Sequence, residues 1–87
     1  MGFTIEFTIR ANEEIAHFRK AGNKAVLNKL SALMQELSEH PFTGTGKPEP
    51  LKHNLSGVWS RRINLEHRVL YEVNENTILI LTVKGHY

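Results

Sequence analysis

The sequence contains no cysteine, so the chain can form neither a disulfide nor a thiolate metal site, and it suits a reducing compartment. It has no apolar run close to the ~20 residues that a bilayer-spanning helix needs, and the N-terminus lacks the apolar core of a secretory signal. Its five histidines show no metal-binding spacing such as HExxH. These absences predict a cytoplasmic protein with no membrane partner and no metal site.

Neither sign of charge dominates the composition. The chain has 11 Lys and Arg against 9 Asp and Glu, a net charge of +2 that does not by itself identify a nucleic-acid binder. A length of 87 residues, with 40% apolar and 23% charged residues, is typical of one soluble domain with a modest core. We therefore expect residues 1–87 to form a single domain, on which local clusters of cations matter more than the total charge.

The first half of the chain predicts one strand and two helices. Residues 3–9 alternate between apolar and polar side chains, as in a half-buried strand. Asn12 is a candidate N-cap for the first helix, which Gly22 would end, and Asn23 is a candidate N-cap for the second, which Pro41 would close. The apolar stripe of the second helix favours a core face over a partner-binding face and comprises Val26, Leu27, Leu30, Leu33, Met34 and Leu37.

The second half predicts a long loop followed by strands. Residues 42–57 are rich in glycine and proline and indicate an ordered loop of functional interest. Residues 58–65 and 68–73 have strand patterns, and 78–83 form a continuous apolar run typical of a strand buried on both faces. The resulting order β-α-α-β-β-β predicts an α+β fold in which two helices pack on one mainly antiparallel sheet.

Two arginines are expected to share the open face of this sheet. Strand alternation directs Arg62 and Arg68 away from the helices, and a guanidinium matches the geometry of phosphate oxygens. The alternative is that Arg68 pairs with Glu72 and that Arg62 is only solvated. The opposite face of the first of these strands should meet the helices, through Trp59, Arg61, Ile63 and Leu65.

Glu49 is the only carboxylate between Glu39 and Glu66, and it has a proline on each side. The prolines restrict the backbone, which suits a general base because such a group must be positioned before its pKa is tuned. An ordinary exposed turn residue is the alternative. The cations Lys52 and His53 follow it closely.

His86 and Tyr87 come shortly after the most apolar strand. An imidazole titrates near neutrality and can give a proton to a leaving alkoxide. A tyrosine ring can stack on a nucleobase, a contact worth about 1–3 kcal/mol. The alternatives are a frayed, inert terminus and a simple hydrophobic anchor.

The block HPFTGTGKPEPLKHNLSGVWSRRINLEHRVLYEV, together with the later GHY, resembles the YoeB family of bacterial toxins in the RelE/ParE superfamily of toxin–antitoxin ribonucleases. The resemblance implies a small α+β ribonuclease that enters the A site of the 70S ribosome and cuts the mRNA there. It places the catalytic glutamate at Glu49 and the phosphate-binding arginine at Arg68. The terminal His-Tyr pair falls on His86 and Tyr87. The surrounding basic positions match Lys52, His53 and Arg62.

The implied mechanism needs no metal and no cofactor, because RNA carries its own nucleophile. Glu49 would take the proton of a 2′-OH, and Arg68, with Arg62 and Lys52, would stabilise charge at phosphorus. His86 would protonate the departing 5′-oxygen. The expected partners are mRNA, the ribosome and a YefM-like antitoxin that covers the site or displaces the tail, and a homodimer is compatible with the sequence.

Three other readings stay open. The chain could be a gyrase inhibitor of the ParE kind, or a module that binds RNA or the ribosome without cutting. It could also be a toxin weakened by Gly85, where relatives often carry an aromatic residue. Substituting Glu49 by Gln separates cleavage from binding.

Overall fold

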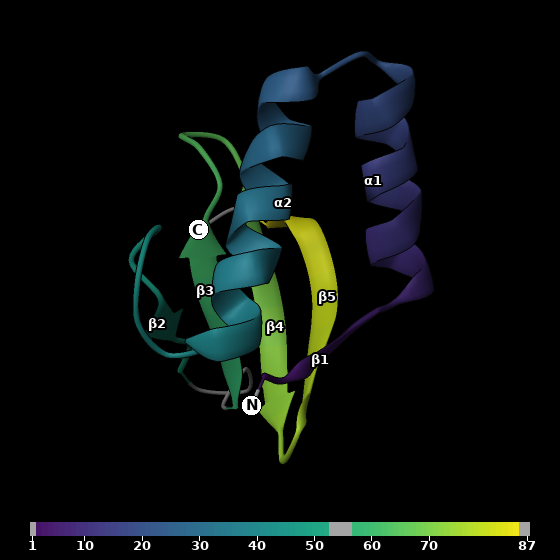
Figure 1. Ribbon diagram of the computed structural model, residues 1–87. Coiled ribbons are helices and arrows are strands. Elements are labelled where there is room, and N and C mark those ends of the chain that lie inside the picture. The colour runs from purple at the N-terminus through teal and green to yellow at the C-terminus, as the bar shows by residue number, and fades with distance from the viewer. Residues whose placement is uncertain (1, 53–56, 86–87) are drawn as a thin grey trace.

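Two helices lie against one face of a five-stranded sheet with the order β1-β5-β4-β3-β2 (Figure 1). This computed structural model describes residues 2–52 and 57–85. The elements are β1 (Thr4–Phe7), α1 (Ile9–Lys20), α2 (Lys24–Glu39), β2 (Glu49–Pro50), β3 (Val58–Arg62), β4 (Arg68–Asn74) and β5 (Thr77–Gly85). Among the pairings of the described residues, only β1–β5 is parallel, so the α+β prediction of a mainly antiparallel sheet is confirmed.

The sequence pattern missed one strand. The two-residue strand β2 lies inside the predicted loop and pairs antiparallel with β3, with Glu49 opposite Ser60. Two residues flanked by prolines give no alternating pattern, so the strand could not be recognised from periodicity. The observed order is therefore β-α-α-β-β-β-β.

The first helix begins earlier than predicted. Its N-cap is Thr8, not Asn12, and the Thr8 hydroxyl oxygen accepts a hydrogen bond from the Ala11 N–H at 3.0 Å. The same hydroxyl donates to the Leu81 carbonyl of β5 at 2.9 Å, a contact between distant residues that no local pattern reveals. Ile9, which alternation placed on the buried side of the strand, is consequently a helical residue with 80% of its surface exposed.

The second helix agrees with its prediction. The Asn23 side chain accepts from the Val26 N–H, and the helix ends before Pro41. Its apolar stripe faces the sheet, where aliphatic and aromatic side chains of α2, β4 and β5 form most of the core. The buried members of the stripe are Val26, Leu30, Leu33 and Leu37.

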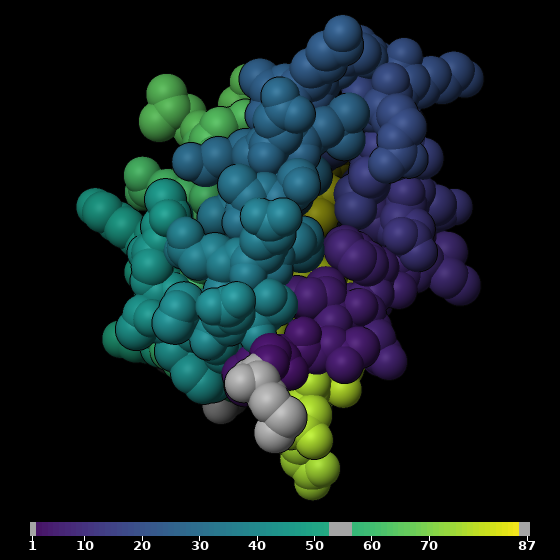
Figure 2. Space-filling view, viewed as in Figure 1, coloured from purple at the N-terminus to yellow at the C-terminus, as the bar shows by residue number. Residues whose placement is uncertain are grey.

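Strand β5 runs between β1 and β4, and its atoms are visible in yellow between the two helices (Figure 2). Ile78, Ile80 and Val83 are fully buried, whereas Leu79 and Leu81 are only partly covered. The prediction of a strand buried on both faces is thus correct for one face and too strong for the other. No helix within the described residues is long and apolar enough to cross a membrane.

Alternation along β3 stops earlier than predicted. The strand ends at Arg62, and Leu65 in the following turn is 99% exposed instead of facing the helices. Arg61 does face the helices and is completely buried, while Arg62 is exposed as predicted.

Candidate functional site

Three strand ends meet at one end of the sheet and bring predicted site residues together. Arg62 on β3 lies directly opposite Arg68 on β4, and Arg68 in turn lies opposite Gly85 on β5. The prediction that the two arginines are neighbours is confirmed. Two arginines at paired positions give this end of the sheet positive charge that an anionic ligand can use.

A depression of about 580 Å³ opens beside these strand ends. Its walls combine the two arginines with the turn that joins β3 to β4 and with the end of β5. The lining residues are Arg62, Asn64, Leu65, Glu66, His67, Arg68 and Gly85. A concave surface with convergent charged groups is the usual form of a binding site.

Glu49 and Arg68 form an ion pair at this site. The Arg68 Nη1 atom donates to Glu49 Oε1 at 3.1 Å and lies 3.3 Å from Ser60 Oγ. The Arg68 side chain is only 12% exposed, whereas Glu49 is 58% exposed and accessible to a ligand. This pairing replaces the alternative in which Arg68 pairs with Glu72. A carboxylate in contact with a held guanidinium can remove a proton beside a bound phosphate.

The backbone holds Glu49 on both sides. The Arg62 N–H donates to the Gly46 carbonyl at 2.8 Å, and the Leu51 N–H donates to the Val58 carbonyl at 2.8 Å. Gly46 has a φ of 83°. A side chain there would also press against Arg61 and the backbone of Arg62. Only glycine therefore lets the loop approach β3 closely enough to present Glu49.

Arg61 is buried and fixes the rest of this loop, although it had no predicted role in the site. Arg61 Nη1 donates to Glu36 Oε1 of α2 at 2.9 Å. Its Nη2 donates to the carbonyl oxygens of His40 and Thr43, each at 2.8 Å. This role of Arg61 could have been inferred from the sequence. Strand alternation directs Arg61 towards the helices, and a buried guanidinium requires a carboxylate or carbonyl partner.

Glu36 is the other half of this connection. The hydroxyl of Thr45 donates to Glu36 Oε2 at 2.7 Å, and the Thr45 N–H donates to Oε1. These two hydrogen bonds, with the nearby charge of Arg61, hold the pKa of the Glu36 carboxyl below its ordinary value despite some desolvation. Glu36 is therefore charged at neutral pH and links α2 to the loop.

Tyr71 of β4 closes the base of the same loop. Its hydroxyl donates to the Pro41 carbonyl at 2.6 Å, and burial raises the pKa of the phenol, so it remains a donor. The segment that leads from α2 to Glu49 is thus tied to α2, β3 and β4.

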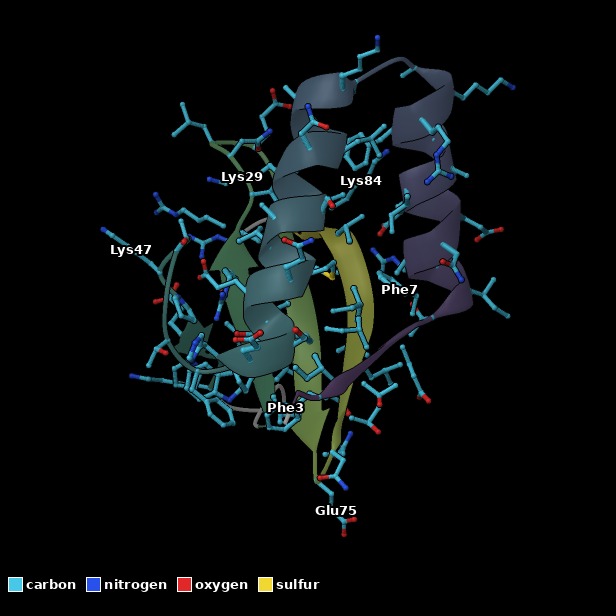
Figure 3. The ribbon with its side chains drawn as sticks, viewed as in Figure 1. Phe3, Phe7, Lys29, Lys47, Glu75 and Lys84 are labelled. Carbon is cyan, nitrogen blue, oxygen red and sulfur yellow. The ribbon has the colours of Figure 1, made fainter. Side chains whose placement is uncertain are left out.

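Of the remaining predicted site residues, one lies at the margin of the site and three lie outside the residues that the structure describes. Lys52 is exposed just after β2. Lys47, which has no predicted role, projects from the loop on the outer side of the molecule (Figure 3). His53, His86 and Tyr87 fall outside residues 2–52 and 57–85, so their predicted roles stay predictions. Within those same ranges, no group of three or more His, Asp or Glu side chains is placed to hold a metal ion.

Comparison with known proteins adds a family. The chain matches, over residues 7–87, the model of a family described as the YoeB-like toxin of bacterial type II toxin–antitoxin systems. Toxin YoeB of Escherichia coli (strain K12) is 49% identical over 65 residues, which make up 75% of this chain and 77% of that protein. The match to the family covers every described residue of the site.

Solved structures of similar proteins share the whole fold. The YoeB/ParE toxin from Agrobacterium tumefaciens has a TM-score of 0.91 at 30% identity, covering 98% of this chain and 100% of that one. A YoeB dimer from Staphylococcus aureus has a TM-score of 0.88 at 40% identity, with 98% of each chain covered. The YoeB–YefM complex from the same organism has a TM-score of 0.86 at 41% identity over 98% of each chain.

Proposed function

The chain belongs to the YoeB-like toxins of bacterial type II toxin–antitoxin systems, and from this premise we propose that it is an endoribonuclease that cuts mRNA in the ribosomal A site. The observation that carries the proposal is the Glu49–Arg68 pair, which combines an accessible base with a largely buried phosphate ligand. Arg68 of this pair lines an open depression, which supports access by an RNA strand.

The reaction is an internal transfer at phosphorus. Glu49 takes the proton of the 2′-OH of the nucleotide before the cut, and the 2′-oxygen forms a bond to phosphorus. Arg68, assisted by Arg62 and Lys52, exchanges its present partners for the phosphate oxygens and stabilises the developing charge. The bond to the 5′-oxygen breaks as His86 donates a proton to it. The products are a 2′,3′-cyclic phosphate and a 5′-OH, with no cofactor involved.

Tyr87 and His53 complete the proposed RNA contacts. The Tyr87 ring stacks on a base next to the cut, and His53 contributes to the basic surface around Lys52. These assignments rest on the family resemblance of the KPEPLKH and GHY segments.

The expected macromolecular partners follow from the family. A YoeB of Staphylococcus aureus has been solved as a dimer and in complex with YefM. By this likeness we propose that the present toxin forms a homodimer and is inhibited in the cytoplasm by a YefM-like antitoxin. The arginines at the end of the sheet favour an acidic antitoxin segment.

The proposal is tested by primer extension on an mRNA bound to ribosomes. We expect wild type to cut in the A-site codon and Glu49→Gln to cut about 10²- to 10⁴-fold more slowly, the usual contribution of general acid–base catalysis. Glu75→Gln is the matched control, because Glu75 lies at the far tip of the β4–β5 turn (Figure 3). The control should cut like wild type.

Undiminished cleavage by Glu49→Gln would refute the role of Glu49 as base. An absence of cleavage by every variant, with ribosome binding retained, would instead indicate a binding module. Inhibition of gyrase without any RNA cleavage would indicate the ParE type of activity.

A further inference from the structure

The last part of β5 departs from a regular strand ladder. Tyr71 and Leu70 are consecutive on β4, but their partners Ile80 and Thr82 are two residues apart on β5. Leu70 and Arg68 are two positions apart on β4, whereas their partners Thr82 and Gly85 are three positions apart on β5. Strand β5 therefore contains extra residues relative to β4, and such bulges leave backbone groups without ladder partners.

Two side chains from the N-terminal part of the chain and one from β5 itself bind backbone groups in this segment. Thr8 donates to the Leu81 carbonyl at 2.9 Å, and Glu14 Oε1 accepts from the Val83 N–H at 2.9 Å. The Thr82 hydroxyl accepts from the Lys84 N–H at 3.2 Å. That hydroxyl lies 2.7 Å from Oε1 and 2.9 Å from Oε2 of Glu14, to which it donates. We call the side chains of Thr8, Glu14 and Thr82 the β5 clamp.

Glu14 is the centre of the β5 clamp and is charged at neutral pH. Burial opposes its ionisation, but hydrogen bonds from Val83, Thr82 and Arg10 hold the pKa of its carboxyl below the ordinary value. The side chain is only 14% exposed. A carboxylate in this position is a stronger acceptor than a neutral group would be.

A second contact attaches the same end of β5 to α1. The Lys84 ammonium lies 5.0 Å from the centre of the Phe18 ring, within cation–π range. Figure 3 labels Lys84 at this end of β5, beside the helices. Helix α1 thus holds both the backbone and a side chain of the residues that lead to Gly85.

The bulged course of β5 sets where the strand ends. Gly85 lies opposite Arg68, and a Cβ on it would overlap the Leu70 side chain and lie 3.2 Å from the Arg68 carbonyl. His86 and Tyr87 follow directly in sequence. The place where β5 ends opposite Arg68 is therefore the start of the segment that carries the proposed general acid.

We propose that Glu14 is a positioning residue for the active site, which through the β5 clamp directs the end of β5 to Arg68 and so places His86 for proton donation. The inference rests on the proposed function. Glu14 touches neither RNA nor the reacting atoms in this account, and its effect is exerted through residues 82–85.

The test compares two leaving groups on ribosome-bound mRNA in single turnover at saturating toxin. One mRNA is unmodified, and the other carries sulfur in place of the 5′-oxygen at the cut. A thiolate leaves without a proton because a thiol is far more acidic than an alcohol. We expect Glu14→Gln to slow cleavage of the normal mRNA about 10-fold, part of the range for acid catalysis, and to cut the sulfur-containing mRNA within about 2-fold of wild type.

Two further variants make the result specific. Glu13→Gln changes an exposed neighbour on α1 and should cut both substrates like wild type. Thr82→Val keeps the side-chain shape but removes the hydroxyl that binds Lys84 N–H, and it should reproduce the selective defect even where Glu14→Gln folds poorly. Thermal unfolding of each variant establishes the folded fraction.

His86→Gln separates this proposal from the proposed function. Two outcomes would overturn the role of Glu14 while leaving His86 as the acid. In the first, sulfur rescues His86→Gln but neither clamp variant. In the second, the clamp variants cut both substrates like wild type. If sulfur fails to rescue His86→Gln itself, the assignment of His86 is overturned and the inference with it.

Discussion

At the scale of single residues, neighbouring side chains of the same type have different roles in the candidate site. Arg61 and Arg62 are adjacent, yet Arg61 is completely buried and Arg62 is exposed. Arg62 faces the site beside Arg68, whereas Arg61 fixes the loop that carries Glu49. Strand alternation predicted the opposite directions of the two arginines, but the partners of Arg61 come from residues 18 to 25 positions away.

Replacing Arg61 by Met should lower the free energy of unfolding by about 1–3 kcal/mol, the usual cost of leaving buried acceptors without their donor. The reason is that the carbonyl groups of His40 and Thr43 would lose the Arg61 donor, while Glu36 would keep only its hydrogen bonds from Thr45. Arg62→Met on the same strand is the control and should change stability by less than about 0.5 kcal/mol. Urea unfolding measures both, and equal effects of the two variants would contradict the role of Arg61.

At the scale of elements, the end of β5 is the least predictable part of the fold. The apolar run at 78–83 predicted a strand correctly, but its bulges depend on Thr8, Glu14 and Thr82. Hydrogen bonds between residues about 70 positions apart leave no local sequence pattern. The helix caps show the same contrast, because Asn23 needs only its neighbour Val26 whereas Thr8 is selected over Asn12 by a contact with β5.

Gly85→Ala tests how tightly this end of β5 must pack. The added Cβ would overlap Leu70, so we expect β5 to shift from β4 and cleavage to fall about 10-fold or more, as small displacements of catalytic groups do. Gly85→Ala combined with Leu70→Val should recover most of the activity, because Val lacks the atom that is overlapped. Single-turnover cleavage measures both variants. Faster cleavage by Gly85→Ala alone would support the alternative that Gly85 weakens the toxin.

At the scale of the whole molecule, the site draws on nearly the full length of the chain. The N-terminal strand and helix hold β5, the loop after α2 presents Glu49, and β3 and β4 supply the two arginines (Figure 1). The sequence predicted the α+β class and the Arg62–Arg68 neighbourhood because both follow from local periodicity. It could not predict β2, the Glu49–Arg68 contact or the β5 clamp, because these depend on how distant segments pack.

The central claim is that this toxin cuts mRNA by using the 2′-OH of the RNA itself as nucleophile. The most direct measurement is cleavage of a ribosome-bound mRNA in which the one nucleotide before the cut is 2′-deoxy. Wild-type toxin should cut the all-ribose mRNA in the A-site codon and leave the 2′-deoxy mRNA intact at that position. Cleavage of both at the same position and rate would contradict the account, because Glu49 would then have no 2′-OH proton to remove.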